Sequence, residues 1–153
     1  MSVTTPEAQL RAAYDAYITA AYALSDARRQ GVRAEIWKAD REMTTLAEKF
    51  NNVKAATRDA FAKSRGWRYD RKRYTRVAEY GTYGRRIIKH PEFFRDAEGA
   101  HVGLITHTAA TLEEISAFAA RRGYNPELLP FSWDAPNYHT AVLFTLKAGA
   151  TWP

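Results

Sequence analysis

The chain of 153 residues contains no cysteine and no long apolar run. Without cysteine it cannot form disulfides, thiolate metal sites or a cysteine nucleophile, and a reducing compartment is permitted. No window approaches the roughly 20 apolar residues that a membrane-spanning helix needs. The start, MSVTTPEAQL, lacks the basic and apolar segments of a secretory signal. We therefore expect a soluble, cytoplasmic protein that has no membrane partner.

The sequence also lacks the short motifs that mark common enzyme classes. There is no GxxxxGK followed by Ser or Thr and no GxGxxG, so no phosphate-binding loop is indicated. No GxSxG marks a serine nucleophile, and zinc-finger spacings are missing. The sequence therefore predicts no cofactor.

What the chain does contain is a concentration of positive charge at 65–89, RGWRYDRKRYTRVAEYGTYGRRIIK. These 25 residues hold nine Lys/Arg and two acidic residues, a net charge of +7, whereas the whole chain carries +6. Clustered positive charge attracts polyanions, and aromatic faces can stack on bases. The stretch therefore predicts a contact with nucleic acid, a ribonucleoprotein or an acidic protein surface.

The cations and some of the aromatic residues of this stretch are the predicted contact residues: Arg65, Trp67, Arg68, Tyr69, Arg71, Lys72, Arg73, Tyr74, Arg76, Arg85, Arg86 and Lys89. The alternative is an ordinary antiparallel sheet, in which Tyr packs inward and Arg lies on the wet face. The localisation of the charge favours a binding surface, because scattered solubilising charge would not leave the rest of the chain nearly neutral.

Two long amphipathic helices are expected before the basic stretch. Residues 5–7, Thr-Pro-Glu, are typical of a helix start, and apolar residues then recur at spacings of three and four until Gly31. A second, cleaner stripe covers 33–63. The two stripes predict a helical hairpin or coiled coil over 1–64, whose seam could also form a homodimer. One unbroken helix through Gly31 is the alternative, since glycine costs only about 1 kcal/mol inside a helix.

The remainder, 65–153, is expected to form the basic, strand-rich segment and an α+β layer in one compact unit. A capping-box spacing at Thr111 predicts a helix that ends at Gly123. Strand-forming residues recur in several segments: 86–89, 92–95, 100–107, 128–133 and 139–147. The order of elements predicts an α+β fold, with an N-terminal helical hairpin followed by a small antiparallel sheet and one packed helix.

The four histidines all lie in the second half of the chain, and simple alternation places His101 and His107 on one strand face. No HxH or HExxH spacing is present, so no metal site is predicted. Metal-free RNA cleavage needs a base, an acid and cations for the phosphate. His101, His107, Tyr74 and Tyr80 are the candidates for those roles, although histidines beside small and apolar neighbours on a strand are typical of half-buried sheet residues.

We therefore expect a non-enzymatic α+β binding protein, with a metal-independent ribonuclease as the alternative. Phages and plasmids often encode small, cysteine-free, basic proteins that regulate or inhibit nucleic-acid-processing machinery, anti-CRISPR proteins included. This last expectation rests on the general style of the chain and on no individual residue.

Overall fold

The computed structural model describes residues 5–72, 79–80, 84–88 and 91–153, with Tyr80 described in its backbone alone. The chain forms two compact units that divide inside the second helix, Met1–Thr57 and Arg58–Pro153. Among the described residues, no helix combines the length and the apolar character that a membrane crossing requires.

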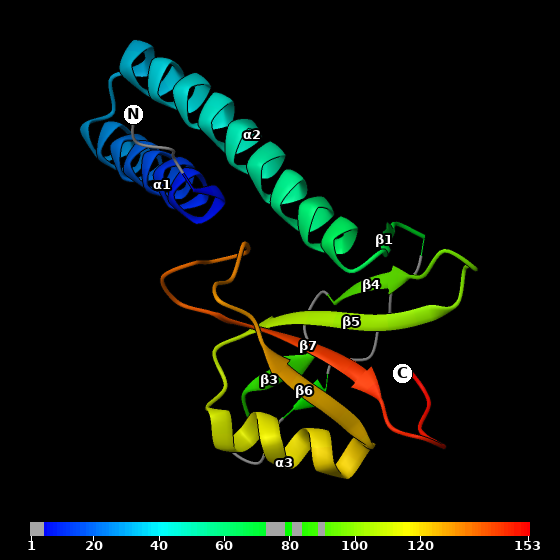
Figure 1. The fold of residues 1–153 in the computed structure, drawn as a ribbon. Helices are drawn as coiled ribbons and strands as arrows, with labels where there is room; N and C mark the ends of the chain where they lie inside the picture. Colours follow the sequence, from blue (N-terminus) through cyan, green and yellow to red (C-terminus); the bar gives the residue numbers. More distant parts are fainter. Residues whose placement is uncertain (1–4, 73–78, 81–83, 89–90) are drawn as a thin grey trace. The chain divides into compact units, whose positions relative to one another are not determined.

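The first unit is a helical hairpin (Figure 1). Helix α1 (Pro6–Gln30) begins where the Thr5 side chain accepts the Ala8 N–H at 3.1 Å. It ends at Gly31, whose φ of 75° is left-handed, a conformation that strains any residue with a Cβ. Helix α2 (Arg33–Ser64) follows at once and continues into the second unit. The predicted hairpin is confirmed, and the unbroken helix is excluded.

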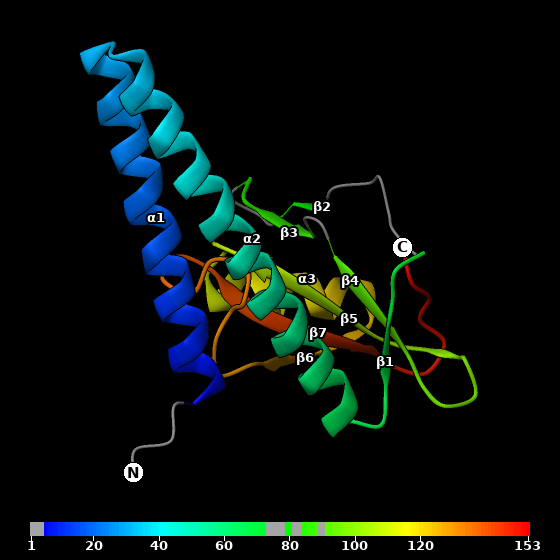
Figure 2. The same cartoon turned by 90° about the horizontal axis from the view of Figure 1, so that it is seen from above.

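The seam of the hairpin is centred on Phe50, which is 5% exposed. Its ring meets the edge of Tyr14 at a centroid distance of 5.4 Å and stacks on Tyr17 at 6.0 Å. Leu46 of the same stripe is half-buried. The two helices lie side by side in both views (Figures 1 and 2). The apolar stripes therefore pack on each other within one chain.

The second unit is built on a five-stranded antiparallel sheet. The strands in spatial order are β1 (Arg68–Asp70), β4 (Glu92–Arg95), β5 (His101–Thr108), β7 (Thr140–Leu146) and β6 (Tyr124–Leu128). A second sheet pairs β2 (Glu79–Tyr80) with β3 (Arg86–Ile88). Helix α3 (Leu112–Arg122) has the predicted capping box and ends at Gly123. The predicted α+β fold is confirmed.

The main hydrophobic core lies between one face of the large sheet, α3 and β3. Phe118 of α3 contacts Tyr124 and Phe144 at ring-centroid distances of 6.0 and 5.7 Å. Ile87 of β3 is fully buried in the same cluster. The Thr106 hydroxyl of β5 donates to the Ile87 carbonyl at 2.6 Å. This bond ties the small sheet to the large one.

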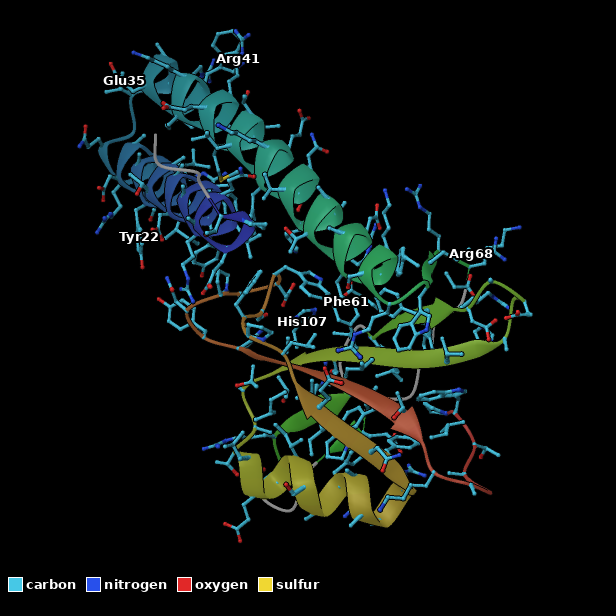
Figure 3. The ribbon with its side chains drawn as sticks, viewed as in Figure 1. Tyr22, Glu35, Arg41, Phe61, Arg68 and His107 are labelled. Atoms are coloured by element: carbon cyan, nitrogen blue, oxygen red, sulfur yellow. The ribbon has the colours of Figure 1, made fainter. Side chains whose placement is uncertain are left out.

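The opposite face of the sheet is covered by the last turns of α2. Phe61 lies 5.9 Å from both Phe94 and Trp133, measured between ring centroids, and 6.3 Å from Trp67 (Figure 3). A Cβ at Gly103 would lie 3.0 Å from the Trp67 ring. Glycine at this position of β5 therefore allows Trp67 to lie against the sheet.

The strand predicted at 128–133 is wrong, because the strand that forms is β6, five residues from Tyr124 to Leu128. Pro126 lies within it, opposite Phe144 of β7. An edge strand needs backbone donors on one side only, so a sheet accepts proline there. Asn-Pro is typical of a turn, and the tertiary pairing overrides that local preference.

The prediction that His101 and His107 share one strand face is also wrong. The register between β4 and β5 skips Val102, which forms a β-bulge. One extra residue reverses the alternation of faces. His101 therefore lies beside Phe93, with ring centroids 6.4 Å apart, whereas His107 lies on the other face, 5.0 Å from the Trp133 ring.

Replacing Phe50 by alanine is expected to lower the stability of the helical hairpin by about 3–5 kcal/mol, since the truncation leaves a cavity beside Tyr14 and Tyr17. The measurement is thermal unfolding followed by circular dichroism at 222 nm. Tyr22→Ala is the matched control, because Tyr22 is also an aromatic residue of the hairpin but is 70% exposed. An equal effect of the two changes would contradict a buried seam.

Candidate functional site

The edge of the sheet at β1 carries the exposed part of the basic stretch. Strand β1 pairs only with β4 in the large sheet. Successive side chains of an extended strand point to opposite faces, so Arg68 and Asp70 lie on one face and Trp67 and Tyr69 on the other. Figure 3 shows Arg68 at the outer edge of the second unit. Among the described residues β1 has a strand neighbour on one side only, and positive side chains border its other side.

Four cations converge on a solvent-open pocket of about 400 Å³ at this edge. Arg68, Arg71, Lys72 and Arg95 line it with Tyr69 and Asp70, so the described residues of the lining carry a formal charge of +3. Within the described part of the chain, only Arg95 among these cations is paired with a carboxylate. We call this group of four cations the β1 basic surface.

Asp70 anchors the pocket. Its side chain is 8% exposed, and one of its oxygens accepts Arg95 Nε–H at 2.8 Å and lies 3.0 Å from His101 Nε2. The other oxygen accepts the backbone N–H of Lys72 at 3.0 Å. Hydrogen bonds from His101 and Arg95 hold the pKa of Asp70 well below its ordinary value of 3.8. Asp70 is therefore ionised at neutral pH, and since a carboxylate only accepts, His101 Nε2 carries a hydrogen.

Other predicted contact residues have structural partners. Arg65 forms an ion pair with Glu127 of β6 and lies over the Phe61 ring at 5.2 Å. Arg85 lies 3.2 Å from Glu114, the buried carboxylate of the α3 capping box. Arg86 is exposed at the start of β3 and does not line the pocket. The contiguous basic stretch is thus divided between separate places in the fold.

The aromatic residues of β1 are packed within the second unit. The Arg58 guanidinium lies 3.7 Å from the centroid of the Tyr69 ring, which also contacts Phe94 at 5.9 Å. Trp67 lies 6.3 Å from both Phe61 and Phe94. Both rings are half-buried. The two rings hold the end of α2 against the sheet. Each also lines a pocket at this edge, so base stacking on these rings stays a prediction.

Several predicted residues lie outside the described residues. These are the contact residues Arg73, Tyr74, Arg76 and Lys89, together with the side chain of Tyr80. The predicted role of the four contact residues in binding stays a prediction. The same holds for the role of Tyr74 and Tyr80 in RNA cleavage, the alternative function.

Sequence reasoning missed Arg95, the fourth cation of the pocket. It belongs to 90–153, where acidic residues outnumber basic ones. Only the pairing of β1 with β4 brings it opposite Arg68. No local pattern marks such a residue, because its role depends on the register of two strands.

His107 is the centre of a buried polar network. Its Nδ1 lies 2.8 Å from Ser132 Oγ, and its Nε2 lies 2.8 Å from Glu92, which also accepts Trp133 Nε1–H at 2.9 Å. The residue types match a hydrolytic triad. Ser132, however, is 1% exposed, and its Oγ already accepts backbone N–H groups, including that of Asp134 at 3.2 Å. The hydrogen bonds of Ser132 are therefore those of a packed interior residue, and its hydroxyl is not accessible to a substrate in this structure.

The two histidines proposed for RNA cleavage do not form a pair. His101 and His107 lie on opposite faces of the sheet, and the His107 side chain is 6% exposed. They cannot serve as the base and the acid on one phosphodiester. In the part of the chain that the structure describes, no three His, Asp or Glu side chains are grouped so as to hold a metal ion.

Comparison with known proteins adds no functional information. No protein-family model matches the chain, and no curated protein or solved structure matches it. The geometry of the described residues is therefore the basis for inferring a function.

Replacing Asp70 by asparagine is expected to lower the melting temperature at pH 7. Because the pKa of Asp70 is depressed in the folded state, its ionised form stabilises the fold above the ordinary value of 3.8, and that stability is lost as the pH falls further. The difference between wild type and variant should thus shrink below pH 4. Thermal unfolding at pH 7, 5 and 3 measures it, with the exposed Glu98→Gln as control. A difference that stays constant with pH would argue against an ionised anchor.

Replacing His107 by alanine is expected to destabilise the second unit, since Ser132 loses its side-chain partner and a buried cavity forms. The loss should be about 2 kcal/mol or more in denaturant unfolding. His139→Ala, at a more exposed histidine, should cost less. Loss of a cleavage activity from a fully stable variant would instead show a chemical role.

Proposed function

We propose that the protein binds nucleic acid through its phosphate backbone, using the β1 basic surface. The observation that carries the proposal is the convergence of four cations on one open pocket, whose described lining residues have a formal charge of +3. Three of the four, Arg68, Arg71 and Lys72, have no carboxylate partner among the described residues. Like charges held together repel one another, and a polyanion relieves that repulsion.

The shape of the surface favours a chain of phosphates over an isolated anion. Arg68 and Arg71 also line a neighbouring pocket of about 260 Å³, together with Trp67 and Asp59. Two adjoining pockets that share two arginines suit a ligand whose charges recur along a backbone. Arginine adds a planar fork that matches phosphate oxygens.

The packing of Trp67 and Tyr69 bears on specificity. Protein groups already pack on part of each half-buried ring, so we expect the four cations to contribute more to binding than base stacking does. Phosphate contacts position a ligand and carry no sequence information. We therefore expect binding that depends strongly on salt and weakly on base sequence.

A protein that covers phosphates without reading bases can regulate or inhibit a nucleic-acid-processing machine by blocking its access. This is the role that small basic proteins of phages and plasmids, anti-CRISPR proteins included, often have. An acidic protein surface is the competing partner, and it predicts that the protein binds neither DNA nor RNA.

The triple variant Arg68→Gln/Arg71→Gln/Lys72→Gln should bind mixed-sequence DNA and RNA more weakly than wild type does. Each lost phosphate contact lowers the slope of log K against log salt by about 0.7–0.9, so the slope should fall by roughly 2–3. Fluorescence anisotropy with labelled oligonucleotides at several salt concentrations measures it.

The matched control is Lys38→Gln/Lys63→Gln/Lys147→Gln, which removes three exposed cations that do not line the pocket. An equal loss in this control would mean that net charge, and not the β1 basic surface, drives binding. If wild type binds no nucleic acid, the proposal fails. Cleavage of RNA in the presence of EDTA would favour the ribonuclease alternative.

A further inference from the structure

We infer that the pocket at β1 is a discrete site for one phosphoryl group, in which Arg95 is a binding residue and Asp70 positions it. This inference rests on the proposed function and makes it more specific. A diffuse basic patch attracts phosphates wherever they lie, whereas a discrete site holds one phosphoryl group against donors that are already oriented.

The register of the sheet is the first observation. Arg68 of β1 and Arg95 of β4 are directly opposite each other in the antiparallel pair. Like charges in directly opposite positions destabilise a sheet. Asp70 compensates only one of the two arginines, Arg95. An anion seated between Arg68 and Arg95 would compensate both.

The second observation is that Arg95 is held from two directions. Its Nε–H bonds Asp70 at 2.8 Å, and its Nη1 donates to the carbonyl of Gly99. The turn that presents this carbonyl is itself ordered, because the Asp96 side chain accepts the N–H of Ala100 at 2.9 Å. Binding therefore requires little loss of conformational freedom at Arg95.

Arg95 keeps donors for a ligand. A guanidinium has five N–H donors, and these two bonds use two of them. The side chain is 35% exposed and lines the pocket. Three N–H groups are thus left to meet a ligand, and a guanidinium edge matches two oxygens of one phosphoryl group.

Asp70 has a positioning role that net charge alone would not suggest. As an anion it lowers the charge of the pocket, and yet it orients Arg95 and accepts the Lys72 backbone N–H. His101 Nε2 lies 3.0 Å from the same carboxylate oxygen that accepts Arg95. The pocket of about 400 Å³ has room for a tetrahedral oxyanion with part of its hydration shell, since liquid water occupies about 30 Å³ per molecule.

The phosphoryl group could be an internal phosphodiester or a terminal phosphate monoester. The two sources are separated by comparing a labelled oligonucleotide that carries a 5′-phosphate with the same oligonucleotide that carries a 5′-hydroxyl. Equal affinities assign the pocket to internal phosphodiesters, and a preference for the 5′-phosphate assigns it to strand ends. In either case, replacing Arg95 or Asp70 should weaken binding.

Two variants test the site in the full chain. Arg95→Lys keeps the charge but loses the planar fork, so affinity should fall about tenfold or more. Arg33→Lys is the control, an exposed arginine of the hairpin away from the pocket lining. Asp70→Asn raises the charge of the pocket, so a diffuse patch should bind more tightly, whereas the discrete site should bind more weakly because Arg95 loses its anchor.

A direct readout is the Nε–H resonance of Arg95 in ¹H–¹⁵N spectra during titration with inorganic phosphate. A discrete site predicts a saturable shift that is absent from Asp70→Asn protein. If Asp70→Asn does not fold, Arg95→Lys and the wild-type titration decide the question. Should the triple variant lose affinity while Arg95→Lys and folded Asp70→Asn match wild type, this inference is wrong and the proposed function stands. Should the triple variant retain full affinity, the proposed function itself fails.

Discussion

The carboxylate of Asp70 is the contact on which the β1 edge of the sheet depends. It forms hydrogen bonds with the Arg95 side chain of β4, with the backbone N–H of Lys72 after β1, and with the His101 ring of β5. It therefore joins three segments of the chain. A buried carboxylate is stable only when its oxygens are hydrogen-bonded and its charge is compensated. Asp70 meets both conditions, and in doing so it fixes Arg95 at the border of the pocket. The stability of the edge and the arrangement of its cations thus have one physical cause.

The rest of the second unit covers the two faces of the sheet. One face of the sheet is closed by α3 and β3, whose apolar side chains form the main core. The other face is closed by the end of α2, through Phe61 and its aromatic neighbours. With both faces covered, the charged side chains at the β1 edge reach solvent without disturbing the core. The aromatic residues beside them, Trp67 and Tyr69, pack against the end of α2 and the sheet.

Three buried or half-buried polar side chains of this unit form one hydrogen-bonded group. His107, Ser132 and Glu92 satisfy one another's hydrogen bonds beneath the Trp133 ring. The bulge at Val102 then sets His101 on the other face, where it supports Asp70. His101 and His107, which the sequence suggested as an acid and a base, thus lie on opposite faces of the sheet and belong to two separate hydrogen-bonded groups.

The features that depend on local chemistry alone, the helix ends and the hairpin, could be predicted from the sequence. Thr5, Gly31, Thr111 and Gly123 set the ends of helices, since a capping side chain or a left-handed glycine acts on its own neighbours. The apolar stripes likewise predicted the hairpin, because helical periodicity is a property of one segment. Tertiary structure alone decided the edge strand through Pro126, the bulge at Val102 and the place of Arg95 in the pocket. Each of these depends on which strands pair and in what register, and pairing between distant segments leaves no local pattern.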